Sequence, residues 1–540
     1  MRGKGVTENP VKSRRKANSD KMSEQVFNYY RPEWTCGRYN KFAKVAIIYN
    51  LIEGMCYFLE DYSAEVIGEI LKSHRNEKIE LNRVANNTNI AEESIQEFFE
   101  ELTNLGLLTN ELPTASFIAD YRQKVKENKH NQSTIEKATQ EKLPYQVTNV
   151  EMDYTEATKG ITSVMFELTY NCSEKCIHCY NPGATRNESE KSHRADRKEL
   201  NLDDYKRIVD ELKNLGLVKV CLSGGDPFSK PEIWNIIQYL YDKEIVFDVF
   251  TNGQKLTNAN TKRLANYYPR LVGISIYSGI EEEHDQITHI KGSWQRSINA
   301  IKQLSELAVP MNLKCCVMRP NVRSYYMVAD LAKQYNAVPQ FEICIADSID
   351  GDLCASQNLR LLPEMMEIVL RDNNVPLYVG KEAPNYGGEE KSMGSNPCGA
   401  GYNSFCITPE GNVQPCVAFP LSFGNLKQKA MAEILENEDL KEWLNLKLQD
   451  YEDCGKLDYC AYCNLCPGNN YLSHGTPLKA SENNCSIAKI RYTLAKKMMN
   501  GYEPLQNKPL KECLSCLDNN IQPLKQVFAH CFEENDEAKR

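Results

Sequence analysis

Residues 169–181 read TYNCSEKCIHCYN, and the three cysteines in this stretch have the spacing C-x3-C-x2-C. Thiolates this close together on one loop, from Cys172, Cys176 and Cys179, can hold three irons of a cubane cluster and leave the fourth iron open to a small molecule. A tetrahedral zinc site needs a fourth ligand, and His178 adjoins Cys179, where joint coordination would need unusual geometry. Ferredoxin loops use the different spacing C-x2-C-x2-C-x3-C. The stretch therefore indicates an iron–sulfur cluster with one open iron.

The region around this loop, residues 161–350, alternates apolar β-branched stretches with amphipathic helical stretches. Six such βα units predict an α/β fold, a parallel sheet or partial (β/α)6 TIM-like barrel. The predicted strands are 162–168, 218–222, 245–250, 271–276, 311–318 and 341–345. Ligands bind at the carboxyl ends of the strands in such folds. The cysteine loop follows the first strand and so lies at that end.

Further unusual loops occur at the same end of the next strands. Gly224, Gly225, Asp226 and Pro227 follow the second strand, residues 251–253 (TNG) follow the third, and Ser275 lies on the fourth. A pair of glycines alone is weak support for a site. The ordered set of loops, together with the cysteine spacing, is specific.

This ordered set resembles the signature of radical S-adenosylmethionine (radical SAM) enzymes. The resemblance implies that Cys172, Cys176 and Cys179 hold the catalytic 4Fe–4S cluster. It also implies that the glycine-rich loop faces the methionine amino group, with Asp226 in place of the usual Glu. The residues that we expect to contact S-adenosylmethionine are Gly224, Gly225, Asp226, Pro227, Asn252, Ser275 and His178.

The chemistry implied by this resemblance begins at the open iron, which chelates the amino and carboxylate groups of S-adenosylmethionine. One electron from the cluster cleaves the sulfonium bond, and the resulting 5′-deoxyadenosyl radical abstracts a hydrogen atom from the substrate. The cofactor performs the difficult step, and the protein positions it and excludes water.

A second group of cysteines lies between residues 398 and 485. It comprises eight cysteines, the number that two fully ligated 4Fe–4S clusters need: Cys398, Cys406, Cys416, Cys454, Cys460, Cys463, Cys466 and Cys485. Two zinc-ribbon sites are the alternative, because C-x2-C pairs also suit zinc. The region resembles the SPASM domain, the auxiliary-cluster extension of radical SAM peptide and protein maturases.

By the SPASM pattern, Cys398, Cys406 and Cys416 share one auxiliary cluster with either Cys463 or Cys466, and the remaining cysteines hold the second. The spacing of the second half departs from the usual order C-x2-C-x5-C-x3-C. The departure leaves open which cysteine joins which cluster and whether one iron stays open. An open iron could bind a substrate thiolate, whereas a closed cluster could only carry electrons.

Residues 36–110 carry two strand patterns and then helices, ending in FFEELTNLGLL. They resemble the leader-peptide recognition element of ribosomal-peptide pathways, the winged-helix-like fold of the small carrier protein of pyrroloquinoline quinone synthesis. A generic winged-helix interaction unit is the alternative. The resemblance implies that a precursor's leader adds a strand to an exposed sheet edge.

These patterns divide the chain into seven segments. They are a disordered basic tail (1–35), the leader-recognition unit (36–110), a linker or solvated helix (111–160), the barrel (161–350), a bridging segment (351–395), the SPASM domain (396–490) and a helical extension (491–540). We expect most remaining cysteines to pack in the core as small hydrophobes: Cys36, Cys56, Cys221, Cys315, Cys316, Cys344 and Cys354. Three further cysteines lie near the end of the chain, and we expect them to lie on a helix face, with a redox or zinc site as the alternative: Cys513, Cys516 and Cys531.

Composition excludes several other classes of function. The 540 residues carry 64 Lys+Arg against 73 Asp+Glu, a net charge of −9. An acidic chain is a poor general binder of nucleic acid. Apolar runs fall far short of the ~20 residues that span a bilayer, and the basic N-terminus lacks the apolar stretch of a secretory signal. We therefore expect a cytoplasmic protein without nucleic-acid or membrane partners, whose 21 cysteines serve metal or redox chemistry.

Together these features predict a radical SAM enzyme with three 4Fe–4S clusters that modifies a ribosomally made precursor peptide. We expect a thioether from cysteine to carbon as its product, ahead of a carbon–carbon cross-link or epimerisation. The expected partners are the precursor, bound through its leader, and a flavodoxin or ferredoxin-like electron donor. A maturase of a folded protein, such as one that installs formylglycine in a sulfatase, is the alternative enzyme. A zinc-rich scaffold is the non-enzymatic alternative.

Overall fold

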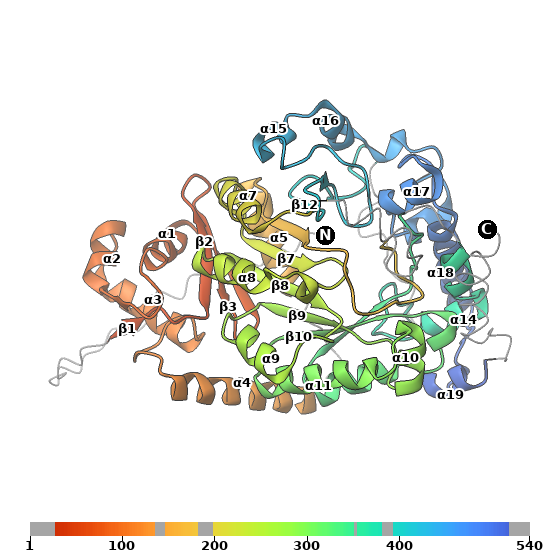
Figure 1. Ribbon diagram of the computed structural model, residues 1–540, viewed down its shortest axis with the longest axis horizontal. Helices are drawn as coiled ribbons and strands as arrows, with labels where there is room; N and C mark the ends of the chain where they lie inside the picture. Colours follow the sequence, from red (N-terminus) through yellow and green to blue (C-terminus); the bar gives the residue numbers. More distant parts are fainter. Residues whose placement is uncertain (1–27, 136–145, 182–197, 350–353, 381–392, 518–540) are drawn as a thin grey trace.

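The computed structural model describes residues 28–135, 146–181, 198–349, 354–380 and 393–517. An N-terminal unit, a large sheet flanked by helices and a cysteine-rich C-terminal region follow one another along the chain (Figure 1). The N-terminal unit lies beside one end of the large sheet, and the C-terminal region lies beside the other.

The N-terminal unit contains a three-stranded antiparallel sheet in the order β2 (Thr35–Asn40), β3 (Val45–Asn50), β4 (Met55–Glu60). Short strands β1 (Tyr29–Tyr30) and β5 (Lys78–Ile79) pair beside it. One face of the sheet packs on helices α1 (Asp61–Ile70), α2 (Leu81–Thr88) and α3 (Glu92–Asn104). Because Tyr29, Arg31 and Trp34 are all buried, the unit begins earlier than the residue 36 expected from the sequence.

The other face of this sheet packs on the segment 111–160 and on the large sheet. That segment was expected to be a linker or solvated helix, and its described residues form two helices, α4 (Ala115–Ile135) and α5 (Gln146–Thr158). Val125 and Tyr154 from these helices are buried against β3 and the starts of two barrel strands. The buried contacts make the segment part of the interface, which its polar composition did not predict.

The large sheet has the strand order β11-β10-β9-β8-β7-β6-β12-β13. Its six parallel strands are neighbours in chain order, as in a partial barrel: β6 (Ser163–Glu167), β7 (Lys219–Ser223), β8 (Val246–Thr251), β9 (Leu271–Ser275), β10 (Met311–Cys316) and β11 (Val338–Glu342). The intervening helices are α7 (Leu202–Asn214), α8 (Ile233–Asp242), α9 (Asn258–Ala265), α10 (Glu281–Thr288), α11 (Ser293–Glu306) and α12 (Met327–Gln334). This α/β architecture confirms the predicted fold class.

The barrel strands alternate between a sealed outer face and a more polar inner face. In β10, Leu313 and Cys315 are buried in the main core, whereas Asn312, Lys314 and Cys316 between and beside them stay partly accessible. Successive side chains of a strand point to opposite faces, so the second set lines the inside of the barrel.

The C-terminal region extends the barrel sheet. Strand β12 (Ser404–Ile407) pairs in parallel with β6, and β13 (Val413–Gln414) pairs antiparallel with β12. The rest of the region is mainly helical and comprises α13 (Cys354–Leu359), α14 (Pro363–Val369), α15 (Met431–Leu435), α16 (Glu438–Asn445), α17 (Pro467–His474), α18 (Glu482–Met499) and α19 (Leu510–Ser515). The sequence did not predict that auxiliary-region strands would join the barrel.

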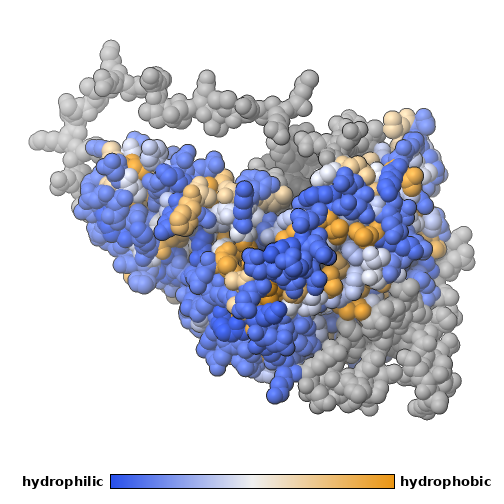
Figure 2. Space-filling model, turned by 90° about the horizontal axis from the view of Figure 1, so that it is seen from above, coloured by the Kyte–Doolittle hydropathy of each residue, from blue (hydrophilic) through white to orange (hydrophobic). Residues whose placement is uncertain are grey.

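The face shown in Figure 2 is mainly hydrophilic, with hydrophobic residues gathered in small groups. Among the described helices, none combines the length and apolar character needed to cross a bilayer.

Candidate functional site

The cysteine loop leaves the end of β6 and crosses the carboxyl ends of the barrel strands. Its backbone is held at the end of α10, where the amides of Lys175 and Ile177 donate to the carbonyls of Thr288 and Ile287. Ile177 is buried beside Tyr277 in a small apolar cluster. The loop is therefore tied at both ends, which suits a site whose three thiols must stay in register.

The two glycines after β7 hold the near side of this loop. The amide of Gly225 donates to the Thr169 carbonyl at 2.7 Å, and the amide of Asp226 donates to the Asn171 carbonyl at 3.0 Å. A Cβ on Gly225 would lie 2.5 Å from the Tyr170 carbonyl oxygen and 2.6 Å from that of Asn171. The backbones approach so closely that a side chain at Gly225 cannot fit.

Asp226 is fully buried beside the cysteine loop. Its Oδ1 accepts a hydrogen bond from the Thr251 hydroxyl. Its Oδ2 has no hydrogen-bond partner within bonding distance among the described residues. Burial raises the pKa of this carboxyl, and the backbone amides of Asn252 and Phe228, which lie close to it, offset the rise only in part. A buried carboxylate oxygen without a donor is costly, and an ammonium group placed there would satisfy it. The residue fits the expected role toward the methionine amino group.

The loop thiols lie in a setting that suits iron. Burial raises the pKa of Cys172 to about 12, and the negative charges of Asp226 and Glu174 add to the effect. Burial and the neighbouring Glu174, Cys179 and Cys172 raise the pKa of Cys176 too. Thiolates here need a compensating cation, and metal coordination deprotonates thiols outright. Cys172, Cys176 and Cys179 would hold the radical SAM cluster.

Side chains from other strands meet the same loop. Asn252 donates to the sulfur of Cys172 at 3.4 Å, and the Tyr277 hydroxyl lies 3.9 Å from the sulfur of Cys176. The His178 ring packs edge-on against Tyr277 at 4.5 Å, and burial lowers the pKa of His178 to about 4. Ser275 ends β9 with its side chain partly accessible and near Tyr277. The structure therefore brings Asn252, His178 and the cysteine loop together.

A buried polar chain that the sequence did not assign supports the loop from α10 and α11. The Ser293 hydroxyl donates to Glu174 at 2.6 Å, the ring of His284 lies 3.0 Å from that hydroxyl, and the Tyr277 amide donates to His284. Each group satisfies the next, as buried polar networks require. His284 and Ser293 thus position the Glu174 carboxylate inside the loop.

Seven of the eight C-terminal cysteines fall into two neighbourhoods. The thiol of Cys416 is influenced electrostatically by Cys466 and Cys398, that of Cys466 by Cys398, and that of Cys406 by Cys416. These four cysteines form the first auxiliary group. It adjoins the barrel, because Cys406 lies on β12 opposite Met165 of β6.

The second auxiliary group contains Cys454, Cys460 and Cys485. The thiol of Cys454 is influenced by Cys485 and Cys460, and that of Cys485 by Cys460. The amide of Cys463 donates to the carbonyl of Cys460 at 3.1 Å, in the turn that precedes α17. In the described part of the chain, no three His, Cys, Asp or Glu side chains are grouped closely enough to hold a single metal ion.

Cys344 was expected to be a packed core residue, and it packs against the main core but also has polar neighbours. It follows β11, is only partly buried, and lies 3.3 Å from the amide nitrogens of both Asn469 and Asn483. The backbone amide of Asn469 also donates to the sulfur of Cys466. The apolar strand before Cys344 did not indicate that polar side chains of α17 and α18 would contact this cysteine.

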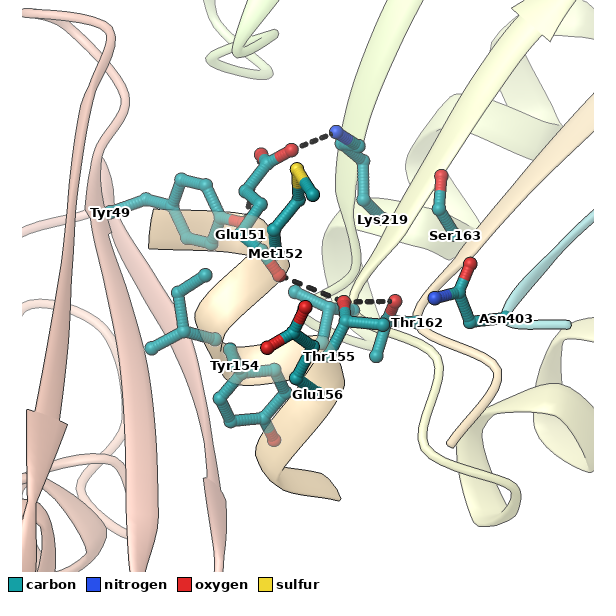
Figure 3. A pocket seen from close by; sticks show the side chains of 12 residues that line it. Tyr49, Glu151, Met152, Tyr154, Thr155, Glu156, Thr162, Ser163, Lys219 and Asn403 are labelled. Carbon is teal, nitrogen blue, oxygen red and sulfur yellow. Dashed lines mark hydrogen bonds and ion pairs between the residues drawn. The ribbon is translucent and has the colours of Figure 1, made fainter. Parts of the chain in front are cut away.

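One pocket lies at the opposite end of the barrel. It is lined by Tyr49, by residues of α5 and by the strand starts at Ser163 and Lys219 (Figure 3). Figure 3 shows Glu151 of α5 paired with Lys219 there. Since ligands of parallel α/β folds bind at the carboxyl ends of strands, we place the candidate site at the cysteine loop.

Comparisons with known proteins agree with this assignment. The Radical SAM superfamily matches residues 166–323, and the SPASM iron–sulfur cluster-binding domain matches residues 398–467. An AdoMet-dependent heme synthase of Methanosarcina barkeri is 27% identical over 325 residues, which is 56% of this chain and 90% of the relative. The antilisterial bacteriocin subtilosin biosynthesis protein AlbA of Bacillus subtilis is 27% identical over 341 residues, covering 60% of this chain and 70% of AlbA.

Among solved structures, anSMEcpe with bound AdoMet has a TM-score of 0.50 and 19% identity, and the match covers 63% of this chain and 98% of that protein. At this identity the likeness concerns the fold. The domain matches, the tied cysteine loop and the unpartnered Asp226 oxygen point to one chemistry, which uses S-adenosylmethionine and 4Fe–4S clusters. The chain carries a radical SAM domain followed by a SPASM iron–sulfur cluster-binding domain, and it is a radical SAM enzyme.

Proposed function

We propose that this enzyme installs an intramolecular cross-link in a ribosomally made precursor peptide, with a thioether from cysteine sulfur to carbon as the product. The observation that carries the proposal is the pairing of β12 with β6. It sets the first auxiliary group beside the inner face of the barrel, next to Met165 and Glu167. Cross-link formation removes two electrons from the peptide, so a second electron acceptor beside the reacting carbon is what oxidative closure requires.

The chain's own residues would prepare this reaction. Bound at the cysteine loop, the cluster and S-adenosylmethionine supply one-electron cleavage and hydrogen-atom abstraction. Asp226 would accept hydrogen bonds from the methionine ammonium, while Thr251 holds its other oxygen. Asn252 would orient the loop by its bond to Cys172. A flavodoxin or ferredoxin-like protein would deliver the electrons.

We assign the auxiliary ligands by their neighbourhoods. Cys398, Cys406, Cys416 and Cys466 would hold the first auxiliary cluster, and Cys454, Cys460, Cys463 and Cys485 would hold the second. Both sets have four thiols, which supports two fully ligated clusters that carry electrons. A cluster with an open iron would require one of these cysteines to stay uncoordinated.

The N-terminal unit would select the precursor. Strand β4 lies at one end of the sheet order β2-β3-β4 and pairs only with β3 among the described strands. Such an edge can accept an extended peptide as a further strand through backbone hydrogen bonds. A leader bound at β4 would raise the effective concentration of its core peptide at the barrel.

A second candidate is modification of a tetrapyrrole, which is favoured by the match to the AdoMet-dependent heme synthase. The two functions use the same radical machinery and differ in substrate. The antiparallel unit with its edge strand β4 suits a peptide, and for this reason we place the peptide first.

The test is anaerobic co-expression of the enzyme with the short peptide encoded beside its gene, followed by intact-mass measurement. Loss of two hydrogen atoms per site, with fragmentation that joins a cysteine to a carbon, would support a thioether. A join between two carbons would mean a carbon–carbon cross-link. Unchanged mass with deuterium gained from heavy water would mean epimerisation.

Iron-coproporphyrin and a folded sulfatase serve as competing substrates in the same assay. Turnover of iron-coproporphyrin with an unchanged peptide would overturn the proposal in favour of the tetrapyrrole. Oxidation of a cysteine in the sulfatase, again with an unchanged peptide, would favour a maturase of folded proteins. Zinc in place of iron in anaerobically purified protein would support a zinc-rich scaffold.

A further inference from the structure

One cation on the inner face of the barrel, Lys314 of β10, has a neighbourhood unlike the others. Its partly accessible side chain alternates with the buried Leu313 and Cys315 and so points inside the barrel. Its nitrogen lies 3.4 Å from the centroid of the Phe250 ring on β8. Among the described residues, it has neither an ion-pair partner nor a hydrogen-bond acceptor within bonding distance.

The geometry of this contact depends on Gly273. Strand β9 separates β10 from β8 (Figure 1), and Lys314 pairs in register with Ser275 while Phe250 pairs with Gly273. A Cβ on Gly273 would lie 2.8 Å from the Phe250 ring and 3.0 Å from Cδ of Lys314. Because Gly273 has no side chain, the lysine stem can cross β9. The ammonium is therefore held beside Gly273 and not beside Ser275, the residue with which Lys314 pairs.

Two other cations at the barrel strands, among the described residues, are neutralised by carboxylates. Lys219 pairs with Glu151, and Arg270 pairs with Asp248 and lies 3.6 Å from Glu151. These pairs close the end of the barrel that faces the N-terminal unit. They also occupy Asp248, which would otherwise be a natural partner for Lys314.

The remaining inner-face carboxylates are engaged as well. Glu342 accepts a hydrogen bond from the amide of Cys344 at 2.7 Å, and Glu167 accepts one from the Tyr180 hydroxyl at 3.3 Å. An aromatic face attracts an ammonium group but leaves its N–H donors without acceptors. Burial lowers the pKa of Lys314, and the charges of nearby groups, including Asp248 and Glu342, offset this only in part. The N–H donors of Lys314 thus lack an acceptor among the described residues, and an anion would supply one.

We propose that Lys314, seated on Phe250 across Gly273, binds a carboxylate of the substrate and anchors it inside the barrel. This inference rests on the proposed function, in which a peptide reacts at this end of the sheet, and it specifies a substrate with an acidic group near the modified residue. S-Adenosylmethionine also carries a carboxylate, which the resemblance assigns to the open iron. The acidic group is therefore an Asp or Glu side chain of the peptide or its terminal carboxylate.

The first experiment measures the reactivity of Lys314 with an amine-acetylating ester, by mass spectrometry of the anaerobic holoenzyme. Glutarate and the peptide encoded beside the gene serve as probes, each with S-adenosylmethionine present. We expect each probe to slow acetylation of Lys314, with the exposed Lys262 as an internal reference. Protection by S-adenosylmethionine alone and by neither probe would overturn the proposal, as would the absence of any protection.

The second experiment uses Lys314→Met, which keeps the apolar stem, and Lys314→Arg, which keeps the charge. We expect Lys314→Met to raise the KM for the peptide about tenfold or more, because a charge-assisted hydrogen bond is worth about 1.5–3 kcal/mol. Lys314→Arg should recover part of this loss. Peptide-independent cleavage of S-adenosylmethionine should stay near the parent rate. Loss of that cleavage in Lys314→Met would instead assign the lysine to S-adenosylmethionine and overturn the proposal.

Peptide variants identify which carboxylate is bound. In these peptides one Asp or Glu at a time is replaced by its amide, or the C-terminus is amidated. When the peptide lacks the carboxylate that Lys314 binds, the parent enzyme and Lys314→Met should have the same KM for it. If the parent enzyme leaves the peptide unmodified, the proposed function fails. Glutarate protection then still decides the role of Lys314, so the two failures are distinguishable.

Discussion

At the scale of single residues, Gly225 is where backbone packing and cofactor binding meet. Its α-carbon faces the carbonyls of Tyr170 and Asn171, and a methyl group there would approach both within 2.6 Å. We expect Gly225→Ala to push the cysteine loop away from the end of β7. The variant should lose most of its cleavage of S-adenosylmethionine and part of its iron, measured by 5′-deoxyadenosine release and iron analysis.

Gly399 is the matched control. A Cβ there meets nothing within 4 Å, and its backbone is not left-handed. Gly399→Ala should therefore keep the parent rate of cleavage. Equal rates for Gly225→Ala and the parent would contradict the assigned contact between the two loops.

Asp226 supports a prediction about cofactor affinity. Asp226→Asn removes the charge from the buried, unpartnered oxygen. The dissociation constant for S-adenosylmethionine should rise about tenfold or more, since a hydrogen bond to a charged group is worth about 1.5–3 kcal/mol. Equilibrium binding to the reconstituted protein measures it.

Thr251→Val is the comparison for this variant. It keeps the carboxylate and removes only the hydroxyl that orients it, so its loss of affinity should be smaller. An Asp226→Asn enzyme that binds S-adenosylmethionine as tightly as Thr251→Val does would show that the charge has no part in binding.

At the scale of elements, the turn before α17 separates the two auxiliary groups. Cys463 and Cys466 are three residues apart. Cys466 lies with Cys398 and Cys416, whereas the proposed partition assigns Cys463 to the second group. We expect Cys466→Ala to change the same electron paramagnetic resonance signal as Cys416→Ala. Cys463→Ala should change the same signal as Cys460→Ala.

The pairing of spectra is the decisive feature of this test, because any single cysteine variant can lose iron. If Cys466→Ala matched Cys460→Ala, the proposed partition would be reversed. Cys513→Ala, in α19 outside both groups, is the control and should leave both signals unchanged.

Strand β2 shows why one element was not foreseen. Its residues 35–40, TCGRYN, lack alternating hydrophobicity, and Gly37 is a weak strand former. In the sheet, the Gly37 α-carbon lies against the carbonyl of Ile47, where a side chain has no room. β2 therefore forms because it pairs with β3, and a pattern read from residues 35–40 alone does not contain that pairing.

At the scale of the whole molecule, the N-terminal unit is joined to the barrel by buried polar bonds. Arg31, with 0% side-chain exposure, donates to Glu244 at 2.8 Å and to the Ser73 carbonyl at 2.7 Å. Because loss of a buried charged partner costs about 3–5 kcal/mol, Arg31→Met should weaken this junction strongly. Hydrogen exchange should become faster in β2 and at the start of β8.

Lys441 provides the control for this junction variant. It forms ion pairs with Glu436 and Glu438 on the surface, where such pairs contribute little. Lys441→Met should leave exchange rates in β2 unchanged. Unchanged rates in Arg31→Met would contradict a stabilising junction.

The same junction determines how leader recognition should be tested. Removal of residues 1–140 would uncover Val218, Val246 and Tyr268, which are buried against the N-terminal unit. A truncated enzyme could then fail for reasons of folding. A proline at Phe58 in edge strand β4 is a narrower change, since the Phe58 amide points away from β3 and its loss removes one outward-facing backbone donor. We expect it to weaken peptide binding while peptide-independent cleavage of S-adenosylmethionine continues.

The sequence by itself determined the chemistry and the fold class. Cysteine spacing, glycine pairs and strand periodicity are local, and they predicted the radical SAM loop, the α/β barrel and the SPASM region before any contact was known. Tertiary structure alone decided which distant groups meet: β12 on β6, Cys466 with Cys398, and Lys314 over Phe250. These contacts depend on packing between segments far apart in the chain, and no local pattern contains that information.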